Sequence, residues 1–230
     1  MTPALTFLGL NPGQISSTSL FAVTFASASS TISYSKQKKI CYDLALKTAI
    51  VAIPGAISGA FISSFIELES FKLYFGILLI LTVIYLSTSN YLVREKRNEG
   101  TKNDTRFALS RLLFYSGVFG AGIISSMFGI GGGIIFVPLL VLVIGMTIAA
   151  ASPTSQLALF ITSFTGTITH AILGHPDYFH AGSLAVGAFF GGQIGARISD
   201  KVGESVLRKL FSGSLMAVAA KLIYDFLGQH

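Results

Sequence analysis

The sequence predicts an all-α fold, namely a polytopic integral membrane protein of two inverted-topology repeats with a broken-helix hairpin in the second. Three observations lead to this prediction: an apolar composition, an internal duplication, and a glycine run between two short apolar segments. Hydrophobic residues make up 52% of the 230 residues and charged residues 11%, whereas a soluble domain has about 25% charged residues. The mean hydropathy is +0.71. This composition excludes a disordered chain, a disulfide-rich secreted scaffold and an ordinary cytosolic enzyme.

Apolar stretches long enough to cross a bilayer recur along the chain, since a membrane-spanning helix needs about 20 mostly apolar residues. The longest hydrophilic segment, 93–111, contains six Lys or Arg and three Asp or Glu. It separates a first repeat (1–92, three spans) from a second repeat (112–230, a hairpin and three spans). The predicted spans are 14–34, 42–63, 71–92, 151–172, 181–199 and 206–227.

An offset of 136 residues relates the two halves. Between Gly9 and Ser63, 17 of 55 positions are identical to the residue 136 positions later, and no gap is needed. Shared apolar composition explains some matches, but it does not align a Ser-x-Thr-Ser cluster together with two glycines four residues apart. We interpret this as an internal duplication. The matches include Gly9/Gly145, Ser16/Ser152, Thr18/Thr154, Ser19/Ser155, Tyr42/Tyr178, Gly55/Gly191, Gly59/Gly195 and Ala60/Ala196.

The basic residues predict the orientation in the membrane. Thirteen of the 16 Lys and Arg residues lie in three clusters, near 36–39, in 93–111 and in 197–209. An even number of membrane segments separates each cluster from the next, so all three face one side, the cytoplasm. The equivalent of the basic segment 36–39 is 172–175, which falls on the other side. The repeats therefore have inverted topology, which is common in secondary transporters. The loops 35–41, 93–111 and 199–206 are predicted to be cytoplasmic.

The glycine run Gly129–Gly133 predicts an interrupted helix. Each glycine in a helix costs about 1 kcal/mol relative to alanine, and the apolar segments on either side are too short to span comfortably. Unwound backbone at membrane depth is tolerated where it is buried in protein or lines a polar cavity. A helix beginning near Ile134 directs its free N–H groups at such a cavity and favours an anion there. The alternative is a bend or a tight helix contact without a ligand.

Two hydroxyl clusters at equivalent positions predict the rest of the site. Ser152-Pro153 fits an N-cap followed by the first helical turn, and Ser16–Ser19 is its partner. Together they could hold an oxyanion from two sides; the alternative is simple capping and bonds between helices. The predicted substrate-binding residues are Gly129, Gly131, Gly132, Gly133, Ser152, Thr154, Ser155, Gln156, Ser17, Thr18 and Ser19.

Other motifs predict structural roles. The glycines at 55 and 59 and those at 187, 191 and 195 suit close helix packing. Lys47 follows Asp43 by four residues, so local pairing is expected; Lys221 and Asp225 have the same spacing. His170 is expected to be a hydrogen-bonded structural histidine, although it could titrate. No catalytic, metal-binding, cofactor-binding or nucleotide-binding motif is present, so we expect no catalytic residue, metal or cofactor.

Three segments carry a resemblance to a known family: Gly129–Leu139 (GIGGGIIFVPL), Ala149–Ser155 and Gly191–Ala196. Over about 120 residues the chain resembles the TauE/SafE sulfite exporter family. The first repeat fits the family from about Pro3. The family carries a GxGGG hairpin in each repeat, and here Met1–Leu5 resembles the residues that follow the motif, so the first hairpin is expected to be missing. The resemblance implies movement of small sulfur-containing anions such as sulfite, sulfoacetate or thiosulfate.

We therefore expect a permease for small, sulfur-containing anions in the cell membrane. Its partners are the lipid bilayer and a small anionic substrate; nucleic acid is not expected, and homo-oligomer formation stays open. The alternatives are a permease for another solute, cation coupling at the unwound carbonyls, and a non-transporting membrane scaffold or partner subunit. An intramembrane enzyme has little support, because no nucleophile–base pair is visible.

Overall fold

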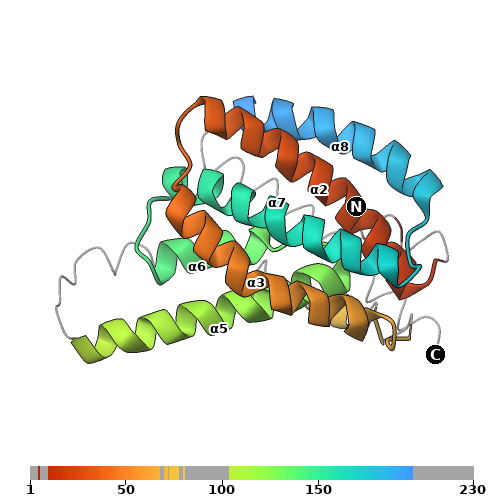
Figure 1. Ribbon diagram of the computed structural model, residues 1–230, viewed down its shortest axis with the longest axis horizontal. Coiled ribbons are helices and arrows are strands. Elements are labelled where there is room, and N and C mark those ends of the chain that lie inside the picture. Colours follow the sequence, from red (N-terminus) through yellow and green to blue (C-terminus); the bar gives the residue numbers. More distant parts are fainter. Residues whose placement is uncertain are drawn as a thin grey trace.

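The computed structural model describes residues 5, 10–67, 70, 71, 73–77, 80 and 104–198 (Figure 1). Within these residues all regular secondary structure is helical, which confirms the predicted all-α class. The predicted spans 206–227 and most of 71–92 lie outside the described residues, as do the loop 199–206 and the pair Lys221 and Asp225. The helices are α2 (Pro12–Lys36), α3 (Tyr42–Ser63), α5 (Asp104–Phe128), α6 (Gly133–Leu142), α7 (Ile148–Ile172) and α8 (Tyr178–Ile198).

The helices pack side by side in the order α8, α2, α7, α3 and α5, with α6 against α7 and α5 (Figure 1). α2 and α7 are therefore the central helices. Their hydroxyl groups cross the interface between them, where the Oγ1 atoms of Thr24 and Thr167 lie 3.1 Å apart.

The central helix α2 is rich in hydroxyls, since eleven of its 25 residues are serine or threonine. Many of these side chains satisfy themselves locally: Thr24 Oγ1 donates to Leu20 O at 2.9 Å and Ser27 Oγ to Val23 O at 2.8 Å. By length and composition alone, α3 is the one described helix apolar enough to cross a membrane, with a mean hydropathy of 1.7, and 112–128 of α5 is a shorter apolar helix. Hydroxyl-rich α2 is instead suited to the protein interior.

Two predicted boundaries differ from the structure. Residues 104–111 of the predicted basic loop 93–111 form the first two turns of α5. The apolar part of that helix begins near Leu112, but Ala, Leu and Arg are good helix formers, so the helix continues past its apolar end. α2 likewise begins before the predicted span, at Pro12, where Gln14 Oε1 accepts the N–H of Asn11 at 3.2 Å.

The helix bounds follow the 136-residue offset. The bounds of α2, moved by 136 residues, are those of α7, and the start of α3 becomes the start of α8. α2 and α7 run in opposite directions in Figure 1, as do α3 and α8. The turns after α2 and α7 share a left-handed residue at equivalent positions, Lys38 (φ 53°) and Gly174 (φ 73°). The inverted repeat remains an interpretation, and this geometry agrees with it.

The two predicted glycine contacts have different outcomes. A Cβ atom on Gly55 or Gly59 of α3 would overlap the carbonyl oxygen of Phe119 or Ile123 on α5, so this pair lets two backbones touch. On α8 a Cβ atom at Gly187, Gly191 or Gly195 meets none of the described residues within 4 Å. The close contact of α8 with α2 is made by Gly192, against Ala26 O.

The α5–α6 hairpin has an apolar core of its own. α6 returns along α5 (Figure 1), and Phe114, Val118, Phe136 and Leu140 are all buried in one cluster. Gly117 lies against the Leu139 side chain, so the two arms approach closely. The hairpin is thus packed between α7 and α3, and its tip points into the bundle.

Gly55→Ala and Gly191→Ala form a matched pair at equivalent positions of the two repeats. We expect Gly55→Ala to lower the free energy of unfolding by about 1–3 kcal/mol, because the new methyl group forces α3 away from α5. Gly191→Ala should change it by no more than about 0.5 kcal/mol. Thermal unfolding in detergent measures both; equal effects would contradict the described packing.

Candidate functional site

The chain is interrupted between α5 and α6, at the predicted glycine run. α5 ends at Phe128 and α6 begins at Gly133, as the sequence predicts to within a residue. Gly129 has φ 64° and Gly131 has φ 73°. These left-handed conformations are readily adopted by glycine and strained for other residues. We call residues 129–133 the glycine tip.

Two serines of α2 hold the glycine tip in place. Ser16 Oγ donates to the carbonyl of Met127, and Ser19 Oγ donates to the carbonyl of Gly129 at 2.7 Å. Both hydroxyls are buried. The end of α5 leaves carbonyl groups without helical partners, and these serines satisfy two of them. A side chain at Gly129 would overlap the Ser16 backbone, so the tip lies directly against α2.

The glycine tip lies near the middle of the two central helices. A Cβ atom on Gly131 would be 2.6 Å from the Val23 side chain and 2.8 Å from the Leu159 side chain. Val23 and Leu159 lie next to the centres of α2 and α7, each of which has 25 residues. Gly131 is therefore about equally far from both ends of these helices, whereas Gly129 lies nearer the start of α2, against Ser16.

The first turn of α6 supplies backbone N–H groups at this place. Its first helical hydrogen bonds are donated by Ile135 and Phe136, both to Gly132 O, at 3.0 and 2.7 Å. The amides of Gly132, Gly133 and Ile134 precede these and have no acceptor within α6. The ring of Phe136 folds back over Gly132. The chemistry of the tip is thus a set of amide donors covered by apolar side chains.

The other predicted residues of the first cluster lie beside this anchor without touching the tip. Ser17 Oγ donates to Gln14 O at 3.1 Å, within its own helix. The Thr18 side chain is fully buried, and its hydroxyl has no hydrogen-bond partner among the described residues. Ser125 of α5 has a second buried hydroxyl of this kind. Of the predicted binding residues Ser17, Thr18 and Ser19, the structure brings Ser19 to the tip. Ser16, which also contacts this part of the chain, was not among the predicted binding residues.

The second cluster does not begin a helix, contrary to the sequence-based prediction. α7 begins at Ile148 with Thr147 at its N-cap, so Ser152 is not a cap and Pro153 lies inside the helix. A proline in the sixth position costs one helical hydrogen bond, and the preceding alanines still extend the helix. Ser16–Ser19 are equally internal to α2.

The hydroxyls of the second cluster are bonded away from the glycine tip. Thr154 Oγ1 donates to Ala150 O at 2.7 Å and accepts the N–H of Cys41 at 3.1 Å. Ser155 Oγ donates to Ser152 O at 2.8 Å, and Gln156 is half-buried. Among the described residues no hydrogen bond joins Ser152, Thr154, Ser155 or Gln156 to the tip. Their role in binding remains a prediction.

A chain of histidines beside the tip was not expected as a unit. Buried His170 places Nε2 3.1 Å from Ser126 O and 3.4 Å from Ser126 Oγ. Its Nδ1 lies 2.9 Å from Nδ1 of His175, whose Nε2 lies 3.2 Å from Ser64 Oγ. The His175 ring also covers Gly13 of α2. The sequence shows His170 and His175 five residues apart, but a turn at Gly174 is needed to bring their rings together.

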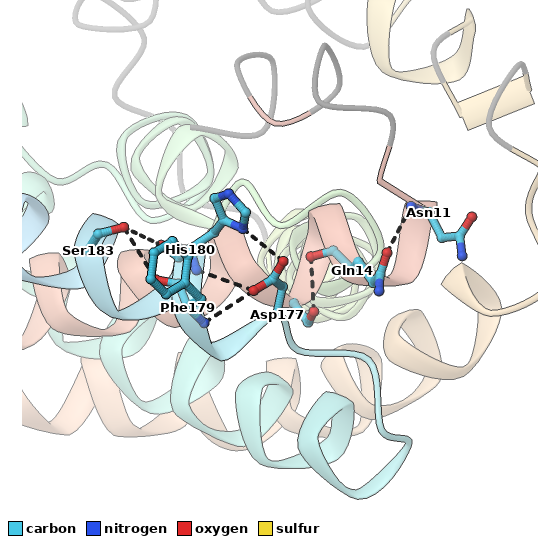
Figure 2. A network of polar contacts seen from close by, with 7 residues as sticks. Asn11, Gln14, Asp177, Phe179, His180 and Ser183 are labelled. Atoms are coloured by element: carbon cyan, nitrogen blue, oxygen red, sulfur yellow. Dashed lines mark hydrogen bonds and ion pairs between the residues drawn. The ribbon is translucent and has the colours of Figure 1, made fainter.

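Other ionisable groups make local pairs. Lys47 and Asp43 form the predicted pair at 2.7 Å on the exposed face of α3. Asp177 accepts the amides of Phe179 and His180 at the start of α8 and pairs with the His180 ring at 2.8 Å (Figure 2). The hydrogen bond from the His180 side chain lowers the pKa of Asp177. No group of three metal-ligating side chains occurs among the described residues.

The comparisons with known proteins agree on one family. The family described as "Sulfite exporter TauE/SafE" matches residues 1–222. "Probable membrane transporter protein YunE" of Bacillus subtilis is 29% identical over 95% of this chain and 84% of its own length. "Probable membrane transporter protein YfcA" of Escherichia coli K12 is 26% identical over 99% of this chain and 82% of its own length. "Sulfite exporter TauE/SafE family protein 6" of Arabidopsis thaliana is 31% identical over 54% of this chain and 29% of its own length. No solved structure matches the chain significantly.

Stability should depend on pH through His175, which lies in the loop before α8. Burial lowers the pKa of His175 below 6.5, so the folded state binds this proton less well than the unfolded state does. The stabilisation is therefore present above pH 6.5 and is lost as the pH falls through the folded-state pKa. We expect the thermal midpoint in detergent to fall with pH in this range, and His175→Gln to reduce that dependence. An unchanged slope in the variant would contradict the assignment.

Proposed function

Because the chain belongs to the sulfite exporter TauE/SafE family, a family of membrane transporters, we propose that it is a permease for small sulfur-containing anions. Sulfite, thiosulfate and organosulfonates are the substrate class we infer. The curated relatives named above are called membrane transporters, and the name of the plant relative mentions sulfite export. The permease we propose performs no covalent chemistry.

The observation that carries the proposal is the glycine tip at mid-length of α2 and α7. Amide groups at the start of a helix, together with the helix dipole, favour a negative charge next to them. The first turn of α6 has such amides at Gly132, Gly133 and Ile134. Amide donors suit the oxygens of a sulfite or sulfonate group.

The closed packing of the tip suggests how access to this site is controlled. Val23 and Leu159 lie against Gly131, and the Phe136 ring covers Gly132. Movement of the α5–α6 hairpin relative to α2 and α7 uncovers the amides from one side of the membrane or the other. Such alternating access around a fixed central site is general among transporters with inverted repeats. The hydrogen bonds from Ser16 and Ser19 set the resting position of the hairpin.

We place the protein in the cell membrane as a multi-pass protein with the basic loops 35–41, 93–111 and 199–206 in the cytoplasm. The arrangement of the helix ends supports this placement. The loop after α2, the start of α5 and the end of α8 lie at the same end of the bundle (Figure 1). The segments 64–67 and 173–177, which contain no Lys or Arg, lie at the opposite end.

Anion flux into vesicles containing the purified protein tests the proposal. Gly132 has an ordinary negative φ of −64°, so Gly132→Ala keeps the backbone, but its methyl group overlaps the Phe136 ring and changes the packing over the amides. We expect radiolabelled sulfite uptake to fall by about tenfold, which corresponds to about 1.4 kcal/mol. The larger Gly132→Leu should abolish uptake. Gly187→Ala, on the open face of α8, is the matched control and should transport normally.

Two outcomes would contradict the proposal. Sulfite uptake that survives Gly132→Leu would remove the glycine tip from the mechanism. Absence of uptake in the wild type would favour a scaffold or a different solute, and thermal stabilisation by ligand separates these two. Stabilisation by sulfite or thiosulfate, with none by chloride, is expected of the anion permease.

A further inference from the structure

The Ser64–His175–His170 chain runs from the exposed end of α3 to a fully buried histidine near the end of α7. Ser64 lies at the exposed end of α3, His175 is half-buried, and the His170 side chain is fully buried. The contacts between them are 3.2 Å and 2.9 Å, and His170 is 3.1 Å from the carbonyl of Ser126. Ser126 is three residues before Gly129, where the glycine tip begins.

The proton positions along this chain follow from its inner end. The Ser126 carbonyl can only accept, so His170 Nε2 carries a hydrogen and donates to it. Neutral His170 then has a bare Nδ1, which accepts a hydrogen from Nδ1 of His175. Neutral His175 in turn has a bare Nε2, which accepts the hydroxyl hydrogen of Ser64. The three contacts are then all hydrogen bonds that point inward, from Ser64 to His175, from His175 to His170 and from His170 to the carbonyl of Ser126.

This arrangement can pass a proton from the outside to His170. A proton added to His175 Nε2 makes an imidazolium, which transfers its Nδ1 hydrogen across the 2.9 Å contact to His170 Nδ1. His175 is left neutral with its hydrogen on Nε2, and His170 holds the added proton. Before a second proton can follow, the hydrogen of His175 must return to Nδ1 by a tautomer change or a ring rotation, as in imidazole relays generally. No other reactant is needed.

Within the part of the chain that the structure describes, no neighbouring charge competes for this proton. The titratable groups in the described segments around the pair are Asp177, His180 and Glu67. Asp177 and His180 are paired with each other at 2.8 Å, and Glu67 is exposed three residues beyond Ser64. α2 and α5 present Gly13 and Ser126 to the histidines, and neither of these titrates.

We propose that Ser64, His175 and His170 form a proton relay that brings a coupling proton to His170, beside the end of α5 that leads into the glycine tip. The inference rests on the proposed function and names the ion that accompanies the anion. A positive His170 beside Ser126 compensates the charge of an anion bound at the tip. Anion uptake driven by a proton gradient therefore depends on the relay, whereas exchange of one anion for another does not.

The test uses the full chain in phosphatidylethanolamine–phosphatidylglycerol vesicles that contain a trapped pH-sensitive dye. Thiosulfate is the probe, because it is fully ionised at neutral pH and does not carry its own proton. Each protein is measured for thiosulfate–thiosulfate exchange and for net uptake driven by an inward proton gradient. We expect His175→Gln to keep exchange and to lose proton-driven uptake and dye acidification by at least about tenfold. His180→Gln, at a paired histidine in the same region, is the control and should behave as the wild type.

A second variant separates proton transfer from a structural role. His175→Ala leaves room over Gly13, so imidazole added to the buffer should restore proton-driven uptake. Proton-driven uptake that survives in His175→Gln, or that imidazole does not restore in His175→Ala, would overturn the relay. Wild-type exchange without proton-driven uptake would also overturn the relay while leaving the permease intact. Absence of exchange in the wild type would overturn the proposed function, and the relay with it.

Discussion

Between α5 and α6 the chain crosses the interior of the bundle, and carbonyl groups at the end of α5 and at the start of the glycine tip have to find partners there. From α2, Ser16 supplies a donor for the carbonyl of Met127 and Ser19 supplies one for the carbonyl of Gly129. A buried polar group left without a partner costs about 1–3 kcal/mol, so the two hydroxyls largely determine where the hairpin can rest. The glycines follow from the same requirement, because α2 comes so close that Gly129 has no room for a side chain.

The hydroxyl-rich central helices show why hydropathy is an incomplete guide to this architecture. α3, on the outside of the central pair, passes a simple length and hydropathy test, whereas α2 and α7 do not. Their hydroxyls bond to carbonyls one turn earlier, as Thr162 does to Ala158 O at 2.8 Å. A serine or threonine satisfied in this way can be buried at little cost. The least hydrophobic of the described helices, α2, is therefore one of the two central helices.

Features governed by local rules could be predicted from the sequence. The bounds of α3, the Asp43–Lys47 pair, the interruption at 129–132 and the packing role of Gly55 and Gly59 all follow from spacing and residue type. The start of α7 could not be predicted in this way, because Ser152-Pro153 reads as a cap although the preceding alanines continue the helix. The partners of His170 depend on a turn and on the adjacent end of α3, which no local pattern specifies.

The equivalent turns after α2 and α7 have a consequence for how one unit can serve on both faces of a bilayer. Lys38 and Gly174 adopt the same left-handed conformation. A non-glycine residue there costs about 1–2 kcal/mol, yet the bend is kept with a lysine in one copy and a glycine in the other. The shape of the bend is thus independent of its charge. If the halves are interpreted as an inverted duplication, charge diverges at such a corner and orients each copy, while the scaffold that it joins stays unaltered.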